Sequence, residues 1–372
     1  MKKKITRRRP AAQSFSAVDL FSGGGGLTVG LKKAGFKVVA AVEMDKAAAK
    51  TYKANHPRVS LIEGDIKTVT ADQILSTSPL GRVDLVTGCP PCQGFSSLTS
   101  KYRRDDPRNG LIAEMERIVE QLAPPAVMME NVPGLAMKGS ARLDKFKARL
   151  HELGYKISCE VLQVADYGVP QRRRRLVLLA GKGFQIEMPK KTHSRSGNDG
   201  LKRWVSVKSA IRGLSKPITL SNAWKRGNGP QDFDWHVVRT LSKDNVRRLR
   251  AARVGKAWTS IAKALRPTCH KKRDAGFSNV YGRMRWGTPS PTITGGCTTF
   301  SKGRFGHPDQ MRTISVREAA LLQTFPKDYV IDTDYMEAAC NIIGNALPCE
   351  FAGVIAGQCM EALRANVQNK RA

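Results

Sequence analysis

Two cysteines stand three residues apart in the segment Gly88-Cys-Pro-Pro-Cys-Gln-Gly-Phe-Ser96, directly after a short apolar run. Cys89 and Cys92 therefore have the spacing of a zinc-binding or a redox-active pair. A structural zinc site needs four ligands, and the sequence offers no second pair of cysteines or histidines at ligand spacing. A thioredoxin-like pair stays open, and so does a single nucleophile at Cys92, because a thiol is the strongest side-chain nucleophile near neutral pH.

A carboxyl group and a run of arginines lie farther along the chain. Glu130 follows the apolar residues 126–129 and precedes Asn131. A glutamate with apolar neighbours is expected to be partly buried, which favours its protonated form and lets it donate a proton. The segment Gln171-Arg-Arg-Arg-Arg-Leu176 supplies cations that would face phosphates or a polar substrate. A thiol, a proton donor and arginines together predict nucleophilic chemistry.

The third chemical feature is a glycine-rich turn with an acidic residue beyond it. In the segment Phe21-Ser-Gly-Gly-Gly-Gly-Leu27, glycine lets the backbone approach a ligand closely. Glu43 follows Gly23 by 20 residues, the spacing at which an acid binds ribose hydroxyls in a Rossmann-type site. Asp65 would accept a hydrogen bond from an adenine amino group. The pattern predicts an adenosine ligand, either a dinucleotide or S-adenosylmethionine, with a purely structural glycine turn as the alternative.

Short apolar runs that alternate with helical stretches must position these residues. Alternation of this kind predicts an α/β fold with a mostly parallel sheet, covered on both faces, and ligands at the carboxyl ends of the strands. The predicted strands are 16–20, 37–42, 83–87, 126–129, 157–164 and 175–180, with one more ending near 63. The predicted helices are 27–35, 45–55, 110–122, 141–153, 316–324 and 350–365.

Positive charge is concentrated in two stretches of a chain whose net charge is +32. Residues 1–14 carry +6 and residues 190–285 carry +19, so the remainder is close to neutral for its length. A stretch of +19 repels itself unless a polyanion is its partner, which predicts a nucleic acid. An anionic membrane suits it less well, because the stretch shows no long amphipathic helix with an aromatic and leucine face.

Length and composition exclude several classes of protein. With 372 residues, of which 41% are hydrophobic, the chain can bury a core and is long enough for about two domains. No uninterrupted apolar run approaches the roughly 18 residues of a membrane span, and no apolar segment follows the basic N-terminus as in a secretory signal. Without a secretion signal, the eight cysteines are expected to be reduced thiols. We expect a soluble cytoplasmic protein.

In their order along the chain, these motifs resemble those of the cytosine-5 DNA methyltransferases, the type typical of bacterial restriction–modification systems and their solitary relatives. Nine segments match over residues 16–181 and about 282–365. They are Asp19–Leu27, Val42–Asp45, Gly64–Ile66, Pro90–Ser96, Glu130–Val132, Gln171–Arg175, Gly282–Thr294, Arg317–Pro326 and Gly344–Pro348.

The resemblance implies a Rossmann-like, S-adenosylmethionine-dependent methyltransferase domain with a smaller, irregular target-recognition domain. The expected divisions are a basic arm at 1–14, a catalytic and cofactor-binding domain at 15–182, a target-recognition domain at 183–310, and a C-terminal part at 311–372 that returns to the catalytic domain. The +19 stretch falls within the target-recognition domain.

The resemblance also implies an activity and the residues that perform it. A DNA (cytosine-5)-methyltransferase would transfer a methyl group from S-adenosylmethionine to a flipped-out cytosine in a specific duplex sequence, without a metal. Cys92 would attack the base at C6, Glu130 would bind its N3/N4 edge, and Arg175 and Arg173 would bind O2. The implied cofactor-binding residues are Phe21, Gly23, Gly25, Leu27, Glu43, Met44, Asp65, Ile66, Pro91 and Asn345.

Two departures from the family pattern stand out. Cys89 occupies a position where family members usually have glycine, so a second thiol lies near the nucleophile. Both wildcard positions of the Gln-x-Arg-x-Arg motif are arginine here. The rival interpretations are an RNA cytosine-5 methyltransferase, a catalytically inactive DNA-binding module, and a nicotinamide oxidoreductase, which would explain the glycine turn but not the basic stretch.

The resemblance further implies partners and a location. Double-stranded DNA would be the substrate, the protein would act as a monomer away from membranes, and a cognate restriction endonuclease is the partner that such a methylase would have. The expected place of action is the DNA in the cytoplasm of a bacterial or phage-infected cell.

Overall fold

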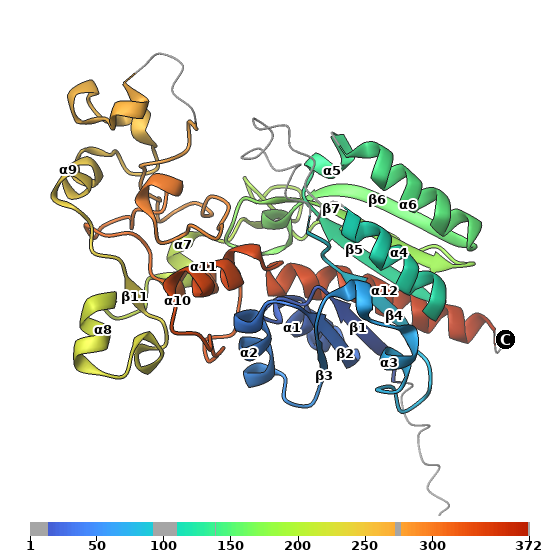
Figure 1. The fold of residues 1–372 in the computed structure, drawn as a ribbon. Helices are drawn as coiled ribbons and strands as arrows, with labels where there is room; N and C mark the ends of the chain where they lie inside the picture. Colours follow the sequence, from blue (N-terminus) through green and yellow to red (C-terminus); the bar gives the residue numbers. More distant parts are fainter. Residues whose placement is uncertain (1–13, 92–109, 138, 272–276, 371–372) are drawn as a thin grey trace, which may run out of the picture.

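The computed structural model of the chain describes residues 14–91, 110–137, 139–271 and 277–370. Figure 1 shows a helix-flanked sheet on one side and an irregular body, coloured yellow to orange, on the other. The red C-terminal helix lies against the blue N-terminal elements, so both ends of the chain build the same body.

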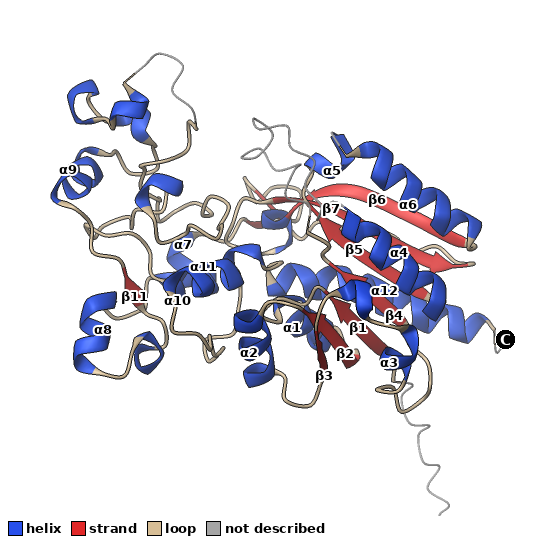
Figure 2. Cartoon of the chain, viewed as in Figure 1, coloured by secondary structure: helices blue, strands red, loops and turns tan. Residues whose placement is uncertain are grey.

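Seven strands form the central sheet in the order β3-β2-β1-β4-β5-β7-β6 (Figure 2). Strands β3, β2, β1, β4 and β5 pair in parallel, whereas β7 is antiparallel to both of its neighbours. The mostly parallel sheet predicted from the sequence is therefore confirmed. The bounds are β1 Ser16–Leu20, β2 Lys37–Glu43, β3 Ser60–Glu63, β4 Leu85–Gly88, β5 Ala126–Asn131, β6 Tyr155–Gln163 and β7 Arg174–Lys182.

Helices cover both faces of the sheet, which explains why its central strands β1, β4 and β5 are buried along their whole length. Along β1, Ala17 packs in a hydrophobic cluster with α1 and α12, and the next residue, Val18, packs in a second cluster with α4 and α6. The bounds are α1 Gly26–Lys33, α2 Lys46–Asn55, α3 Ala71–Leu75, α4 Leu111–Leu122, α5 Gly134–Met137, α6 Ser140–Glu152, α10 Val316–Leu322, α11 Met336–Asn345 and α12 Cys349–Asn369.

The C-terminal helix α12 packs closely against α1 at a glycine. A Cβ built on Gly30 would lie 2.4 Å from the Ala352 Cβ, so a larger residue at position 30 would push the helices apart. The span Met336–Asn369 contains an 18-residue window apolar enough to cross a membrane, and 61% of that window is buried inside the protein. The search of the sequence for continuous apolar runs did not find this window, because its apolar residues are interspersed with polar ones.

Residues 183–310 form most of the irregular body and contain only short elements. One hydrophobic cluster joins Trp235 and Ile293 of this stretch to residues of α10 and α11, so the packing crosses the predicted boundary at 310. The bounds are β8 His193–Ser194, β9 Lys202–Arg203, α7 Val207–Ile211, β10 Ile218–Thr219, α8 Leu220–Arg226, β11 Val237–Val238 and α9 Lys243–Ala251.

The far end of this body, residues 243–271 and 277–281, has a small core of its own, and we call it the basic lobe. Its buried residues are Ala252, Ala257, Trp258, Ile261 and Val280. Aromatic rings extend this core, since Trp258 stacks on His270 with 4.8 Å between ring centroids, and the Arg266 guanidinium lies 5.0 Å from the Trp258 ring.

Candidate functional site

The predicted site residues gather where the parallel strands end. Leu20, the last residue of β1, is paired with Val42 near the end of β2 and with Gly88 at the end of β4. Gly88 is in turn level with Met129 of β5. The glycine turn, Glu43, the Pro90-Pro91 segment and Glu130 therefore share one edge of the sheet, as expected from the sequence.

Three of the four glycines of the turn, Gly23, Gly24 and Gly25, have different surroundings. A Cβ built on Gly23 would meet nothing within 4 Å, so this side of the turn is open. A Cβ on Gly24 would lie 2.4 Å from the Ile342 side chain, and one on Gly25 would lie 2.5 Å from His56 Nε2. Of these three, only Gly23 has open space where a side chain would be, whereas contacts within the protein require glycine at positions 24 and 25.

Glu43 holds the turn through its carboxylate. One oxygen accepts a hydrogen bond from the Gly23 N–H at 2.7 Å, and the other accepts from the N–H groups of Met44 and Asp45 at 3.0 and 2.8 Å. Burial raises the pKa of Glu43. The Met44 side chain, in contrast, is 66% exposed beside this acid, where it offers an apolar surface to a ligand.

Asp65 follows β3 and begins a turn of 3₁₀ helix, Ile66–Thr68, by accepting a hydrogen bond from the Lys67 N–H at 3.1 Å. Its second carboxylate oxygen is available to a ligand as far as the described residues show. The Ile66 side chain is buried in the sheet's second cluster. Asp65 thus has a capping role and remains compatible with the predicted adenine contact.

Phe21 and Leu27 flank the glycine turn in contrasting ways. Phe21 has a φ of 58°, a left-handed conformation that is strained for a residue with a large side chain and is typical of functional sites. Its ring packs near Gly88, where a Cβ would be 3.3 Å away. The Leu27 side chain is in the core, so only its backbone can face a ligand.

Asp19, within β1, is a site residue to which the sequence motifs gave no role. It is completely buried; one oxygen accepts from the Thr28 hydroxyl at 2.7 Å, and the other has no partner among the described residues. Burial raises the pKa of Asp19 to about 7. A buried acid with a free oxygen beside an open glycine turn suits a cationic group, and S-adenosylmethionine carries an ammonium. The residues present fit that cofactor.

Glu130 forms a buried ion pair at the end of β5. Its Oε1 lies 2.5 Å from Arg175 Nε, and the side chains are only 9% and 12% exposed. The antiparallel β7 brings them together, because it enters the sheet beside β5 with its first residues level with the end of β5. A guanidinium and a carboxyl group here can together bind a polar, planar ligand.

The Cys89 thiol lies beside Glu130, one residue beyond the paired ends of β4 and β5. Burial raises the pKa of Cys89 well above its usual value, and the negative charges of Glu130 and Asp19 raise it further. Cys89 is therefore held as a neutral thiol. This environment disfavours Cys89 as the nucleophile.

Cys92 lies outside the described residues, which resume at 110. The backbone that leads to it is fixed by Asn131, whose side-chain amide donates to the carbonyl oxygen of Pro90 at 3.0 Å. Pro91 is half-buried at the end of this segment. Asn131 had no role in the sequence-based prediction; its place directly after Glu130 was the available signal.

A network of buried amides and an arginine joins β7 to the C-terminal part. Gln171 donates to Gln323 Oε1 at 2.6 Å and accepts from the Ile293 N–H at 2.8 Å. Arg173 Nη1 donates to the carbonyl oxygens of Ile293 and Gly344 at 2.7 and 3.2 Å. One end of Arg173 thus supports the backbone, and its role at a base stays a prediction. Asn345, next to Gly344, has an exposed side chain.

Exposed basic side chains line one face of α9 in the basic lobe. Lys243, Arg247 and Arg250 are exposed and spaced to share a side of the helix. Arg247 has a loose ion pair with Asp244 at 3.6 Å, and no carboxylate in the described part of the chain pairs with the other two. Such a ridge of cations suits a row of phosphates.

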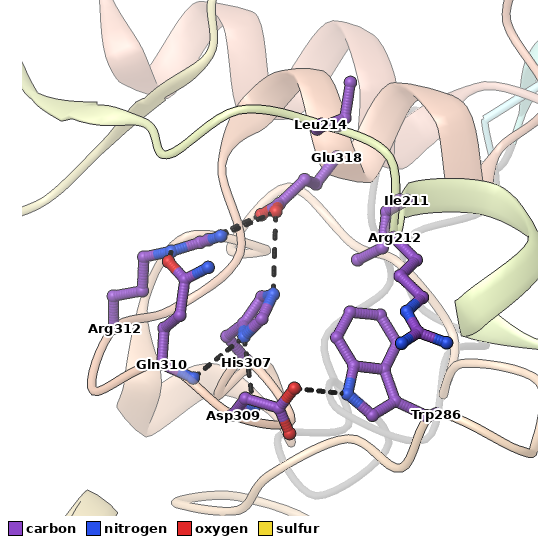
Figure 3. A pocket seen from close by; sticks show the side chains of 9 residues that line it. All are labelled: Ile211, Arg212, Leu214, Trp286, His307, Asp309, Gln310, Arg312 and Glu318. Atoms are coloured by element: carbon purple, nitrogen blue, oxygen red, sulfur yellow. Dashed lines mark hydrogen bonds and ion pairs between the residues drawn. The ribbon is translucent and has the colours of Figure 1, made fainter.

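A pocket of about 210 Å³ contains none of the predicted site residues (Figure 3). Arg312 donates to both oxygens of Glu318 at 2.7 Å, and Glu318 also completes the cap of α10 with Ser315. Arg312 and Glu318 thus serve the fold. The lining residues are Ile211, Arg212, Leu214, Trp286, His307, Asp309, Gln310, Arg312 and Glu318.

Comparison with known proteins identifies similar sequences over almost the whole chain. The profile of the family described as C-5 cytosine-specific DNA methylase matches residues 15–361. Type II methylase M.HgiDII of Herpetosiphon aurantiacus is 35% identical over 346 residues, which cover 92% of this chain and 94% of that protein. Type II methyltransferase M1.HphI of Haemophilus parahaemolyticus is 32% identical, covering 92% and 86%.

Solved structures show the same architecture. A DNA modification methyltransferase encoded within an Escherichia coli prophage has a TM-score of 0.70 at 26% identity and covers 94% of this chain and 100% of its own. DNMT2 of Spodoptera frugiperda has a TM-score of 0.61 at 19% identity, with coverage of 94% and 100%, and this likeness concerns the fold alone.

Proposed function

Since this chain belongs to the C-5 cytosine-specific DNA methylase family, we propose that it methylates a flipped-out cytosine in a specific duplex sequence through a covalent adduct with Cys92. The family makes it a DNA (cytosine-5)-methyltransferase of the restriction–modification type. The observation that carries the proposal is the buried pair of Arg175 and Glu130, 2.5 Å apart, beside the strand that leads to Cys92.

S-adenosylmethionine supplies a methyl group activated by the positive charge on its sulfur. The open side of Gly23 gives it access to the backbone, and Asp19 would accept a hydrogen bond from its ammonium group. Glu43 would bind the ribose and Asp65 the adenine. The other residues proposed to contact it are Phe21, Gly25, Leu27, Met44, Ile66, Pro91 and Asn345.

Cys92 would perform the covalent step. Its thiolate sulfur would form a bond to C6 of cytosine, and the electron pair of the C5–C6 double bond would move to C5. S-adenosylmethionine would supply the methyl group that C5 takes, and the cofactor sulfur would keep the electron pair of the broken methyl–sulfur bond. A base removes the proton from C5, the double bond re-forms, and the bond between sulfur and C6 breaks to regenerate the thiolate. No net oxidation or reduction occurs, and one proton is released.

Glu130 and Arg175 would stabilise the negative charge that reaches the ring when sulfur adds. Glu130 would hold a proton at the N3/N4 edge, and Arg175, with Arg173 behind it, would bind O2. Their low exposure strengthens these interactions, because little water competes with them. Asn131 fixes the Pro90 carbonyl and so helps to aim the following Cys92.

The basic lobe would bind the DNA backbone while other parts of residues 183–310 read the sequence. Chemistry at C5 requires that the cytosine leave the stack, which costs a few kcal/mol and must be offset by protein contacts. The exposed α9 cations are placed to supply such contacts. We further propose that the protein acts as a monomer, on DNA in the bacterial cytoplasm, beside a cognate endonuclease.

The experiment that tests the proposal uses duplex DNA with 5-fluorocytosine at the target, identified beforehand by bisulfite sequencing of plasmid from expressing cells. Fluorine cannot leave C5 as a cation, so the methylated base stays bonded to sulfur. Wild type and Cys89→Ser should give a complex that survives SDS and heat, whereas Cys92→Ser should not. An adduct that depends on Cys89 instead, or on neither cysteine, would contradict the proposal.

A further inference from the structure

The closed side of the glycine turn is made by residues far away in the sequence. The Tyr329 hydroxyl donates a hydrogen bond to the carbonyl oxygen of Gly24. His56 Nε2 lies 3.2 Å from the carbonyl oxygen of Gly25 and 3.2 Å from the Tyr329 hydroxyl. These two side chains therefore bind the carbonyls of Gly24 and Gly25, whereas Gly23 has open space where a side chain would be.

Tyr329 is itself fixed by its neighbours in the segment 329–332, which lies along the end of α2. The side-chain amide of Asn55 donates to the Val330 carbonyl at 2.8 Å and accepts from the Val330 N–H at 3.0 Å. The Asp332 N–H donates to the Thr51 hydroxyl at 2.9 Å. The Tyr329 ring also packs on Phe325, with 4.8 Å between centroids. The hydroxyl is thus held in place before any ligand binds.

The hydrogen bonds around His56 define how its ring is protonated. Lys32 Nζ lies 3.0 Å from His56 Nδ1, and since an ammonium group can only donate, Nδ1 must accept. Burial, with the charge of Lys32, lowers the pKa of His56 to about 4, so the ring is neutral near pH 7. The single ring proton then lies on Nε2 and points at the Gly25 carbonyl.

We propose that Tyr329 and His56 are positioning residues for the cofactor, acting through the backbone of the glycine turn. By binding the carbonyls of Gly24 and Gly25, they orient the turn so that Gly23 and the N–H groups at the start of α1 face S-adenosylmethionine. Neither side chain touches the cofactor. The inference rests on the proposed function, because it assigns the same cofactor to this turn.

The test compares Tyr329→Phe with wild type, using S-adenosylmethionine binding by calorimetry and duplex DNA binding as separate measurements. Loss of one buried hydrogen bond should raise the cofactor Kd about fivefold. KM for the cofactor should rise equally, while kcat at saturating cofactor and the DNA Kd stay within about twofold. Tyr335→Phe is the matched control, because Tyr335 is 73% exposed only six residues away.

A second measurement needs no cofactor at all. In the cofactor-free protein, amide hydrogen exchange at residues 23–27 should be several-fold faster in Tyr329→Phe than in wild type, with β5 unchanged. For His56, the leucine variant should show the same defects. His56→Gln should restore binding in part, because its amide can still donate to the Gly25 carbonyl.

The outcomes separate the two proposals. Equal cofactor Kd values and equal exchange rates in wild type, Tyr329→Phe and His56→Leu would overturn the positioning role alone. An equal loss of cofactor binding, DNA binding and kcat would also overturn it, since that result indicates general damage to the fold. A wild-type protein that binds DNA but no S-adenosylmethionine would overturn the proposed function as well.

Discussion

The sheet edge and the basic lobe hold their functional side chains by different means. At the sheet edge, Glu130 and Asp19 belong to strands whose neighbours on both sides fix the backbone, and each is almost fully buried. In the basic lobe, α9 packs through its last residue, Ala251, on a cluster of five buried residues, one of which, Trp258, stacks on His270. The comparison teaches that the proposed chemistry lies on a part with a large core, and the proposed DNA contact on a part with a small one.

The largest effect is expected from a substitution at the sheet edge. Replacing Glu130 with Gln should lower kcat by about 100-fold or more, because it removes the group that we propose shares a proton with the base. The cofactor and DNA Kd values should stay within about threefold, as measured by calorimetry and fluorescence anisotropy. A control is Glu114→Gln, in a surface ion pair with Arg117. If kcat of Glu130→Gln fell less than threefold, the proposed role would have to be withdrawn.

The second prediction concerns the exposed cations of α9 in the basic lobe. The triple variant Lys243→Gln, Arg247→Gln and Arg250→Gln should weaken DNA binding at least tenfold and leave cofactor binding unchanged. The slope of log K against log salt should become shallower by about 0.9 for each phosphate that the variant no longer neutralises. Anisotropy titrations over a range of salt concentrations measure both quantities.

Its control removes three positive charges from the catalytic body instead, at Lys145, Lys147 and Lys156. If this variant lost DNA affinity and salt dependence to the same extent, net charge rather than the α9 ridge would account for binding.

The third prediction concerns the sheet edge and states how Asp19 makes the stability of the protein depend on pH. The folded-state pKa of Asp19 is raised from 3.8 to about 7, so between these values the folded protein holds a proton that the unfolded chain has lost. Stability of the cofactor-free protein should therefore fall as pH rises from about 4 to 7, by about 4 kcal/mol at most. Urea unfolding of wild type and Asp19→Asn measures this, and the variant should lack the trend.

An ammonium group near Asp19 would favour its ionised form. Cofactor binding near pH 6 should then release a proton from wild type but not from Asp19→Asn, as read from binding enthalpies in buffers of different ionisation enthalpy. Identical proton release by both proteins would place the ammonium elsewhere.

The smallest effect is expected inside the basic lobe. Arg266→Gln removes a guanidinium that lies over Trp258, an interaction worth about 0.5–2 kcal/mol. Amide exchange should accelerate within residues 243–271 and not in the sheet, because the lobe opens separately. If exchange in β1 and β5 rose as well, the lobe and the sheet would form one cooperative unit, and the contrast between them would fail.

The strands of the sheet could be predicted because each is indicated by a short run of neighbouring residues in the sequence. Apolar runs such as 126–129 indicate strands that are buried on both faces of the sheet. A glycine or an acidic residue then indicates where the strand ends. Helix α11 was missed because its polar residues, Asn341 and Asn345, obscure the pattern. The basic lobe could not be predicted, since its core joins aromatic residues as distant as Trp258 and Tyr281, and nothing in the sequence shows that they meet.

The site was predictable only in part. The motifs supplied Glu130 and Arg175, but their pairing depends on β7 running antiparallel beside β5, which no local pattern shows. Asp19 was missed because it stands within a strand that reads as apolar. Gly25 was predicted as a ligand contact, and its surroundings show that His56 already requires a glycine there.

The packing of α12 on α1 has a consequence for how the protein is made. A ribosome that adds about 5–20 residues per second needs roughly 15 to 60 seconds between finishing α1 and finishing α12. Throughout this time the part of α1 that packs on α12 has no partner from its own chain, and chaperones can bind it. The segment that we propose to contact DNA emerges before the catalytic body is complete. A nascent chain can therefore meet the chromosome before it can modify it, and premature termination before residue 349 yields a product without activity.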